Sequence, residues 1–274
     1  MCPSDTLAHV VEPQYPAAVE RYLDLGQFFD VESCKKVRAA ICCYADQYRA
    51  AYQRAYRALH AAGEVEDTLR TLMTEDWDRA RLEKRTQGIL SREIGRRGKG
   101  SGSVSQRFLG GPTCKGLVTR FDTVEQLADR IYVLLDSYGL GDILLQLAAA
   151  LAAERRYDVI ACPDENHPGK LLHLLIPELS LAFVTSREGM AYAGQAYRRI
   201  HLDSMLNPAA VKRCNARCRF YRRMHGLLME EAYEGLRDAK ASHDLLEAAY
   251  HPAVDFAGVQ ALAEREWQRI ASVL

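Results

Sequence analysis

The first third of the chain alternates apolar and polar positions with the period of an α-helix. Across residues 31–94 the apolar side chains recur at spacings of three and four, which is typical of amphipathic helices. The pattern predicts a helix that starts near Asp30 or Ser33, either of which can cap it, and a helix that ends at Gly63. A further helical stretch is predicted from Val65 to Ile94.

The middle of the chain has short apolar runs of strand length. Ile131–Leu135 is a compact apolar run, and a glycine-containing turn and a predicted helix, Ile143–Arg155, follow it. Strand, turn, helix and strand in succession predict a parallel sheet in an α/β fold. The other predicted strands are 107–109 and 116–121, on either side of a turn at 110–113, and 158–162 and 181–185.

Glycine, serine and basic residues interrupt the pattern at 95–103, which is typical of a linker or an exposed loop. Beyond the α/β region, helices are predicted over about 208–250 and 258–273. The predicted domains are a helical region over 1–94, a linker over 95–105, an α/β domain over 106–207 and a C-terminal helical region over 208–274.

Composition excludes several classes of protein. Lys and Arg number 36, and Asp and Glu also number 36, so no net charge draws the whole protein to nucleic acid or membrane. The chain starts without a signal peptide, and polar residues interrupt its most apolar stretch, 131–153. We therefore expect a cytoplasmic protein without a membrane span. The eight cysteines are interpreted as reduced, mostly buried thiols, and no metal site is expected.

One motif carries recognisable chemistry. Residues 136–143, Asp-Ser-Tyr-Gly-Leu-Gly-Asp-Ile, lie between a predicted strand and a predicted helix, the context of a phosphate-binding loop G-x-x-x-x-G-K-[ST]. In such a loop the backbone N–H groups cradle phosphates, the lysine neutralises their charge and Ser or Thr holds Mg²⁺. Here Asp136 replaces the first glycine, Asp142 the lysine and Ile143 the Ser or Thr. The glycines at 139 and 141 remain.

These replacements remove the groups that act on phosphate. Asp142 changes the local charge by two units, and a like-charge contact at about 4 Å costs on the order of several kcal/mol at an effective dielectric near 20. Ile143 has no oxygen for a metal, whereas Asp142 suits a helix start. We expect the turn to be a strand–helix connection. A retained nucleotide site would consist of Gly139, Leu140, Gly141, Asp142 and Ile143.

Six segments together support a resemblance that spans nearly the whole chain. They are residues 8–19, 25–30 and 54–62, followed by 107–122, 175–183 and 239–247. The chain resembles a poorly characterised family of bacterial proteins with two tandem P-loop domains, described as ATPases or nucleotide kinases. The resemblance implies a P-loop NTPase-like parallel sheet with extensive helical additions, and ATP with Mg²⁺ as the ligands. The chain departs from the family at Asp136, Asp142 and Ile143, and it lacks the first domain's loop.

The two helical regions share one register. Shifting the chain by 177 residues places Ala55 on Ala232 and Leu59 on Leu236 without a gap. Apolar, polar and charged positions match together, which favours an internal duplication over a chance likeness of two amphipathic helices. Region 1–94 is therefore interpreted as the helical remnant of a first repeat.

The duplication has consequences for the N-terminal region. The strand at 181–185 corresponds to residues 4–8, and we expect the rest of the first sheet and its loop to lie before Met1. The helices of region 1–94 carry apolar stripes that need a surface to pack against. We expect this region to expose an apolar face, and the protein to self-associate or to bind a separately encoded P-loop partner.

Two other groups of residues are candidates for function. Asp164 and His167 follow the predicted strand 158–162, on the side of a parallel sheet where ligands bind. Basic and aromatic residues crowd one helix over 212–223, a composition that suits phosphate backbones. The alternative is a solvated face that pairs with acids such as Glu230 and Glu231.

The sequence thus favours a degenerate P-loop NTPase-like protein without hydrolysis that acts as an interaction or regulatory module. One alternative is an ATP-binding protein that uses the 136–143 loop with a lysine or arginine from elsewhere. A second alternative is nucleic-acid binding through the basic 212–223 helix.

Overall fold

The computed structural model describes residues 21–74, 77–95, 98–167 and 169–272. Contacts divide the chain into two compact units. One unit spans Asp46–Ser242 and contains the sheet, and the other combines the residues up to Ala45 with those from His243 on. The units differ from the predicted domains, because the helices of 46–94 belong with the α/β region. The strand expected at residues 4–8 lies outside the described residues.

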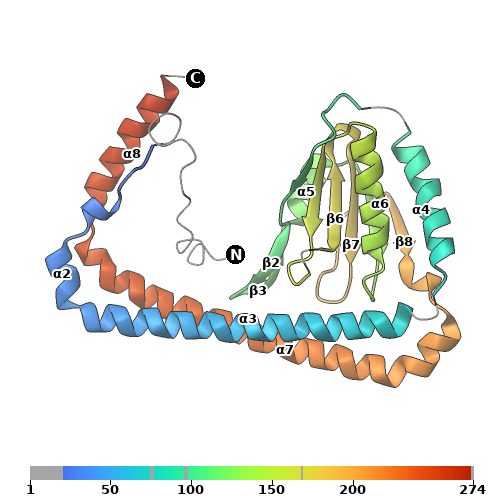
Figure 1. Ribbon diagram of the computed structural model, residues 1–274, viewed down its shortest axis with the longest axis horizontal. Coiled ribbons are helices and arrows are strands. Elements are labelled where there is room, and N and C mark those ends of the chain that lie inside the picture. The colour runs from blue at the N-terminus through green and yellow to red at the C-terminus, as the bar shows by residue number, and fades with distance from the viewer. Residues whose placement is uncertain (1–20, 75–76, 96–97, 168, 273–274) are drawn as a thin grey trace. The chain divides into compact units, whose positions relative to one another are not determined.

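The larger unit is built on a mixed six-stranded sheet (Figure 1). Five strands run parallel, and β6 runs antiparallel to both of its neighbours. In spatial order the strands are β1 (Val104–Gln106), β5 (Val159–Pro163), β6 (Leu171–Ile176), β7 (Leu181–Ser186), β4 (Arg130–Leu135) and β8 (Arg198–His201).

The α/β class is confirmed, but the prediction of a purely parallel sheet is wrong at β6. The β6 strand and the edge strand β8 were not predicted at all. Short connections join β5 to β6 and β6 to β7, and short connections permit only antiparallel neighbours. The predicted strands at 131–135, 158–162 and 181–185 are confirmed within a residue or two as β4, β5 and β7.

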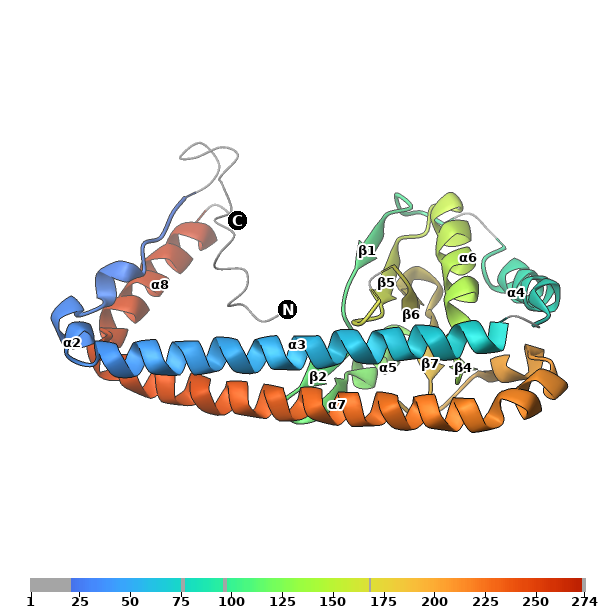
Figure 2. The ribbon, with the colours of Figure 1, turned by 60° about the horizontal axis from the view of Figure 1, so that its bottom comes forward.

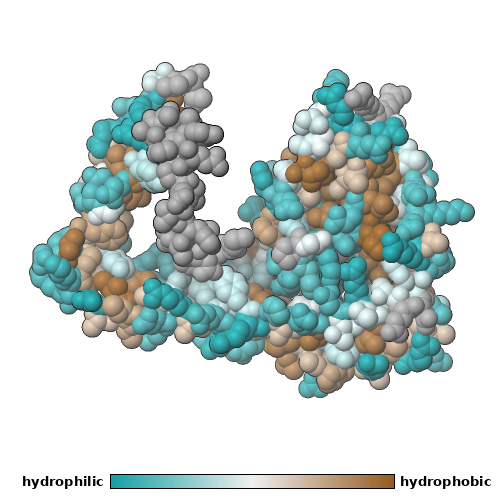
Figure 3. Space-filling view, viewed as in Figure 1, coloured by the Kyte–Doolittle hydropathy of each residue, from teal (hydrophilic) through white to brown (hydrophobic). Residues whose placement is uncertain are grey.

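Helices cover both faces of the sheet. The helices α4 (Arg79–Glu93) and α6 (Gly141–Glu154) pack with one face in the larger apolar core. The short helix α5 (Phe121–Leu127) packs through Val124 against the other face. Apolar surface remains along the outer side of α6, where Leu147 is exposed (Figure 3). The helix predicted at 143–155 is confirmed.

A small hairpin replaces one predicted turn. Residues 110–113 form strand β2 (Gly110–Thr113), which pairs antiparallel with β3 (Gly116–Thr119), and the reversal lies between them. Gly116 has a φ of 94°, a left-handed conformation that glycine adopts without strain. The glycine-rich segment 110–113 is therefore a strand and not a turn.

The expected linker is also different in the structure. Its described part packs on the sheet, because the Asp158 carboxylate accepts the backbone N–H groups of Ser101 and Ser103 at 3.2 and 2.9 Å. These bonds, with those from the two serine hydroxyls, lower the pKa of Asp158 to about 2. Strand β1 starts directly afterwards, at Val104.

Two long helices, α3 (Arg38–Thr74) and α7 (Pro208–Tyr250), run antiparallel side by side (Figure 2). The predicted helix end at Gly63 is wrong, since α3 continues to Thr74. Gly63 is buried beside the loop after β5, where a Cβ would lie 3.4 Å from the His167 ring. Small buried residues allow the two helices to pack closely, and they are Ala51, Ala55, Ala58, Ala62, Ala232, Gly235 and Ala239.

The smaller unit is helical. It contains η1 (Gly26–Phe28), α2 (Val31–Lys36), η4 (His251–Ala253) and α8 (Phe256–Ala271), together with the outer ends of α3 and α7. The predicted cap is confirmed, because the Asp30 carboxylate accepts the N–H groups of Glu32 and Ser33. The C-terminal helices are confirmed as α7 and α8.

The register shift of 177 recurs in the backbone geometry. Two isolated β-bridges, Phe29 with Val254 and Trp77 with Leu206, map onto each other under that shift with their order exchanged. The shift also relates the helix caps Asp78 and Asp255, whose side chains accept from Arg81 and Gly258 at 2.9 Å. This agreement supports the internal duplication.

The remaining expectations concern the membrane and the thiols. Among the described residues, no helix combines the length and the apolar character needed to cross a bilayer. All seven described cysteines are free thiols, but only Cys162 and Cys218 are buried. The expectation of mostly buried thiols is therefore wrong for this part of the chain. Cys42 and Cys43 are exposed on α3.

The close approach of α3 and α7 generates a stability prediction. A Cβ at Gly235 would lie 3.0 Å from the Ala55 Cβ and backbone nitrogen, so Gly235→Ala must push the helices apart. We expect a loss of about 1–3 kcal/mol in the free energy of unfolding, measured by urea denaturation. The matched control is Gly88→Ala in α4, where a Cβ meets nothing within 4 Å. This control should gain about 0.5–1 kcal/mol. An equal response of the two variants would contradict the prediction.

Candidate functional site

The predicted phosphate loop follows β4, and its backbone donors are already occupied. The buried Asp136 carboxylate turns back into the loop and accepts three backbone N–H groups. The Oδ1 atom accepts from Tyr138 at 3.1 Å and Leu140 at 3.0 Å, and Oδ2 accepts from Gly141 at 2.7 Å. A carboxylate of the chain thus accepts the backbone N–H groups of this turn, so they are not free to bind another acceptor.

The glycines of the loop fit this carboxylate. A Cβ at Gly141 would lie 3.0 Å from Asp136 Oδ2, so glycine allows the close approach. Gly139 has a φ of 71° and forms the left-handed step of the turn. Burial raises the pKa of Asp136, while the three N–H bonds oppose that shift. These bonds stabilise the ionised form inside the protein.

The other predicted loop residues have structural contacts. Leu140 is buried, and Ile143 is half-buried against the larger core. Asp142 lies in the first turn of α6, as expected, but its carboxylate accepts the Leu171 N–H at 2.8 Å and so connects the helix to β6. Asp136, and not Asp142, satisfies the free N–H groups at the helix start.

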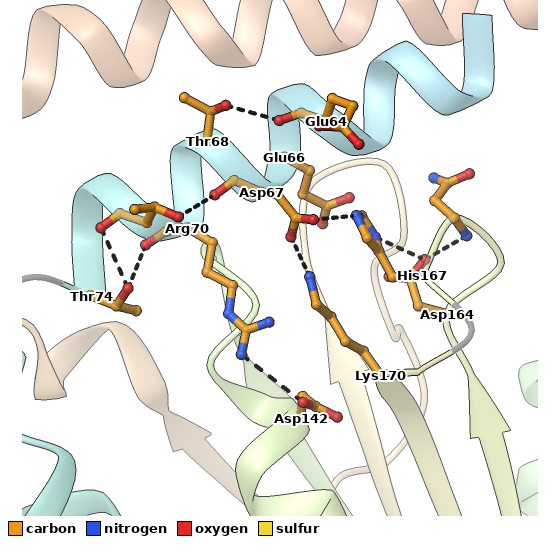
Figure 4. Close-up of polar contacts among 12 residues, drawn as sticks. Glu64, Glu66, Asp67, Thr68, Arg70, Thr74, Asp142, Asp164, His167 and Lys170 are labelled. Carbon is orange, nitrogen blue, oxygen red and sulfur yellow. Dashed lines mark hydrogen bonds and ion pairs between the residues drawn. The ribbon is translucent and has the colours of Figure 1, made fainter. Parts of the chain in front are cut away.

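Asp164 and His167 belong to a charged cluster between α3 and the strand ends (Figure 4). Asp67 of α3 contacts His167 Nε2 at 3.1 Å and forms an ion pair with Lys170. Asp164, buried directly after β5, lies 3.8 Å from His167 Nδ1. Arg70, one turn further along α3, lies 4.0 Å from Asp142. The cluster therefore lies beside the loop, as its place after β5 suggested.

Arg187 closes the cluster on the other side. It follows β7 directly, forms an ion pair with Glu66 of α3, and lies 3.7 Å from Asp164 Oδ2. Burial lowers the pKa of Arg187, but the two acids outweigh burial and raise it. The cluster and loop enclose a cavity of only about 30 Å³, the room of about one water.

The charges within the cluster compensate one another. The carboxylates of Asp164 and Asp67 raise the pKa of His167, against the effect of burial. Burial raises the pKa values of the two acids, but Lys170 and His167 lower that of Asp67, and His167 and Arg187 lower that of Asp164. The result is a network of ion pairs that fastens α3 to the strand ends.

Three of these side chains have ligand atoms close enough together to hold a cation. They are Glu66, Asp164 and His167, whose ligand atoms lie within 4.8 Å of one another. The Arg187 guanidinium contacts both of the acids, and a bound cation would have to displace it. The arrangement therefore suits an ion-pair network better than a metal centre.

A larger cavity of about 580 Å³ lies next to the cluster, between α3, α7, the β2–β3 hairpin and the loops after β5 and β7. Its size is that of a small-molecule site. Leu69, Leu117 and Met229 give it an apolar wall, and Arg187 and Glu165 contribute polar groups. Burial raises the pKa of Glu165 to about 7. None of the three N–H groups held by Asp136 belongs to a residue that lines it.

The basic segment of α7 differs from one interpretation of the sequence. Glu230 pairs with Arg237, and Glu231 pairs with Arg54 of α3, so these acids do not pair with the basic residues. Arg222 lies over the Tyr138 ring, 4.9 Å from its centroid. The basic residues Lys212, Arg213, Arg217, Arg219 and Arg223 are exposed, as is Phe220.

Sequence reasoning missed most of the cluster. Glu66, Asp67 and Arg70 lie almost 100 residues before β5, in a segment read only for its apolar stripe. Their acidic pair and a basic residue one turn later were the available signal. Arg187 stands two residues beyond a predicted strand, at the edge where ligands bind in α/β sheets. Neither signal indicates a common site until α3 is known to pack beside the strand ends.

Comparison with known proteins identifies no relative. No protein-family model matches the chain, and no curated protein or solved structure is detectably similar to it. The interpretation of the site therefore depends on its own geometry.

The His167 contacts predict a pH-dependent contribution to stability. Because the folded protein raises the pKa of His167, its stabilisation is fully present below pH 6.5 and is lost as the pH rises through the folded value. We expect His167→Gln to lower the free energy of unfolding by about 1 kcal/mol at pH 5.5 and by less at pH 8.5. The exposed His60 on α3 supplies the control, His60→Gln, which should show no such difference. A larger loss at pH 8.5 would contradict this prediction.

Proposed function

We propose that this chain is a P-loop NTPase-like protein whose loop no longer binds phosphate, and that it acts as an interaction or regulatory module without hydrolysis. The proposal rests on one observation. The Asp136 carboxylate accepts hydrogen bonds from the N–H groups of Tyr138, Leu140 and Gly141. A phosphate would need those same donors. The like-charged Asp142 lies at the start of the helix beside them.

The ATP-binding alternative requires a cation from elsewhere in the chain. Arg70 places a guanidinium beside the loop, 4.0 Å from Asp142 and next to Gly139. Its charge is compensated by that carboxylate. A nucleotide would therefore have to displace Asp136 and to compete with Asp142 for Arg70, and the interaction role has the stronger support.

Three changes are designed to restore nucleotide binding. Asp136→Gly frees the loop donors, Asp142→Lys adds the neutralising charge and Ile143→Ser adds a metal ligand. We expect calorimetry to show no ATP binding by the wild-type protein and micromolar to millimolar binding by the triple variant. The double variant Asp142→Lys/Ile143→Ser is the control. It should show no ATP binding, because the Asp136 carboxylate still accepts the N–H groups of the loop.

Two results would count against this proposal. One is Mg²⁺-dependent ATP hydrolysis by the wild-type protein that disappears when Gly141 is replaced. The other is a folded triple variant with no affinity, which would mean that the turn lacks P-loop geometry.

Nucleic-acid binding through α7 is a second candidate function. It is favoured by the exposed basic face, whose expected acidic partners pair with other residues. Binding to single-stranded DNA should then weaken linearly in log salt. Replacing Arg217, Arg219 and Arg223 by Gln should reduce the slope by about 0.7 for each phosphate that the variant no longer neutralises. The control is Arg81→Gln/Arg85→Gln on the exposed side of α4, and equal weakening in both variants would reject α7 as the binding face.

The interaction role includes a partner or a second copy of the chain. In the smaller unit several large apolar side chains are exposed, among them Tyr22, Val31 and Trp267. Exposed apolar surface of this kind favours association.

A further inference from the structure

The two halves of the duplication place equivalent residues in different surroundings. In the larger unit Asp78 donates its N–H to the Met205 carbonyl at 3.1 Å, and α4 and η3 (Leu202–Met205) then pack on the α/β domain. In the smaller unit Asp255 donates to the Phe28 carbonyl at 2.9 Å, and α8 and η1 lie in the equivalent places. The shift of 177 relates each residue of one junction to one of the other.

The residues that pack on the α/β domain have apolar counterparts. Leu202 corresponds to Leu25, and Leu90 of α4 corresponds to Trp267 of α8. The smaller unit therefore has apolar residues at the positions equivalent to the contact face, although it has no sheet among the described residues.

Burial separates the two faces. Leu202 is 0% exposed and Leu90 is 3% exposed, whereas Leu25 is 53% and Trp267 is 66% exposed. The face formed by Leu25 and Trp267 thus has the form of a docking surface with nothing docked on it among the described residues.

We propose that this face docks a second α/β domain of the same kind as residues 104–201, supplied from outside the described residues. The inference rests on the proposed interaction role and gives that role its surface and its partner. A second copy of this chain does not fit, because its own α/β domain is already covered by its own α4 and η3.

One position specifies how the partner domain differs. In α4, Glu93 pairs with Arg130 and accepts the Tyr132 hydroxyl at 2.6 Å, which connects the helix to β4. The counterpart of Glu93 in α8 is Ile270, which is 50% exposed. The docked domain should therefore present an apolar residue where this chain has Arg130.

The test completes the duplication in one chain. Residues 95–201 are placed a second time directly before Leu25, in place of residues 1–24, which reproduces the junction between His201 and Leu202. The two tryptophans of the chain, Trp77 and Trp267, are unchanged in number, so fluorescence reports on them alone. Acrylamide quenching of the exposed tryptophan should fall several-fold in the fusion, and the emission should shift to the blue.

A matched substitution makes the test specific for the proposed face. Ile270→Glu restores a partner for the copied Arg130, so it should raise the thermal midpoint of the fusion while changing the original chain little. A folded fusion in which Trp267 remains as quenchable as before would overturn the proposal. A dimer of the original chain that protects Trp267 would also overturn it, since the face would then belong to a second copy.

Hydrogen exchange on the original chain decides the matter if the fusion does not fold. The amides of α8 should exchange about tenfold or more faster than those of α4, because no domain covers α8. Equal protection of the two helices would mean that the face is already covered and would reject the proposal. None of these measurements depends on nucleotide binding, so failure of the loop hypothesis and failure of the docking hypothesis are separate results.

Discussion

A buried carboxylate shapes the loop on which the interpretation of this protein depends. Asp136 leaves β4, turns inward and accepts three N–H groups of the turn that follows. A buried charge is tolerated only when it is well hydrogen-bonded, and buried N–H groups need acceptors. Here the carboxylate and the N–H groups satisfy each other's need for hydrogen-bond partners. The turn is therefore held by a carboxylate of the chain, and the same hydrogen bonds satisfy the N–H groups at the start of α6.

The charged cluster has a similar character. Alanines and Gly235 allow α3 and α7 to pack closely, and Gly63 of α3 lies beside the loop after β5. That approach puts Glu66 and Asp67 opposite Arg187 and Lys170, where each charge finds a partner. A site arranged for chemistry usually keeps one charge or one open volume for its substrate. This cluster keeps neither, whereas the larger cavity beside it does provide an open volume.

The two segments related by the shift of 177 residues have similar local structure in different tertiary surroundings. Asp78 and Asp255 cap their helices in the same way, and the two bridges at Trp77 and Phe29 are equivalent. Local rules thus give the same local structure twice. The helices that follow also differ in what lies against them, because Leu90 is buried by a sheet domain and Trp267 is exposed.

Local sequence patterns set the secondary-structure elements. Apolar spacing predicts β4, α6 and the C-terminal helices, and Asp30 is one of the two predicted caps, because these features depend on neighbours a few residues away. The departures from the loop pattern at Asp136, Asp142 and Ile143 are also visible in the sequence, because the pattern consists of residue types at fixed spacing. Other features depend on long-range contacts. The β6 strand lies antiparallel between β5 and β7, α3 continues through Gly63, and the Asp136 carboxylate accepts the N–H groups of the turn that follows it. These outcomes depend on residues that are distant along the chain or on the direction in which one side chain turns.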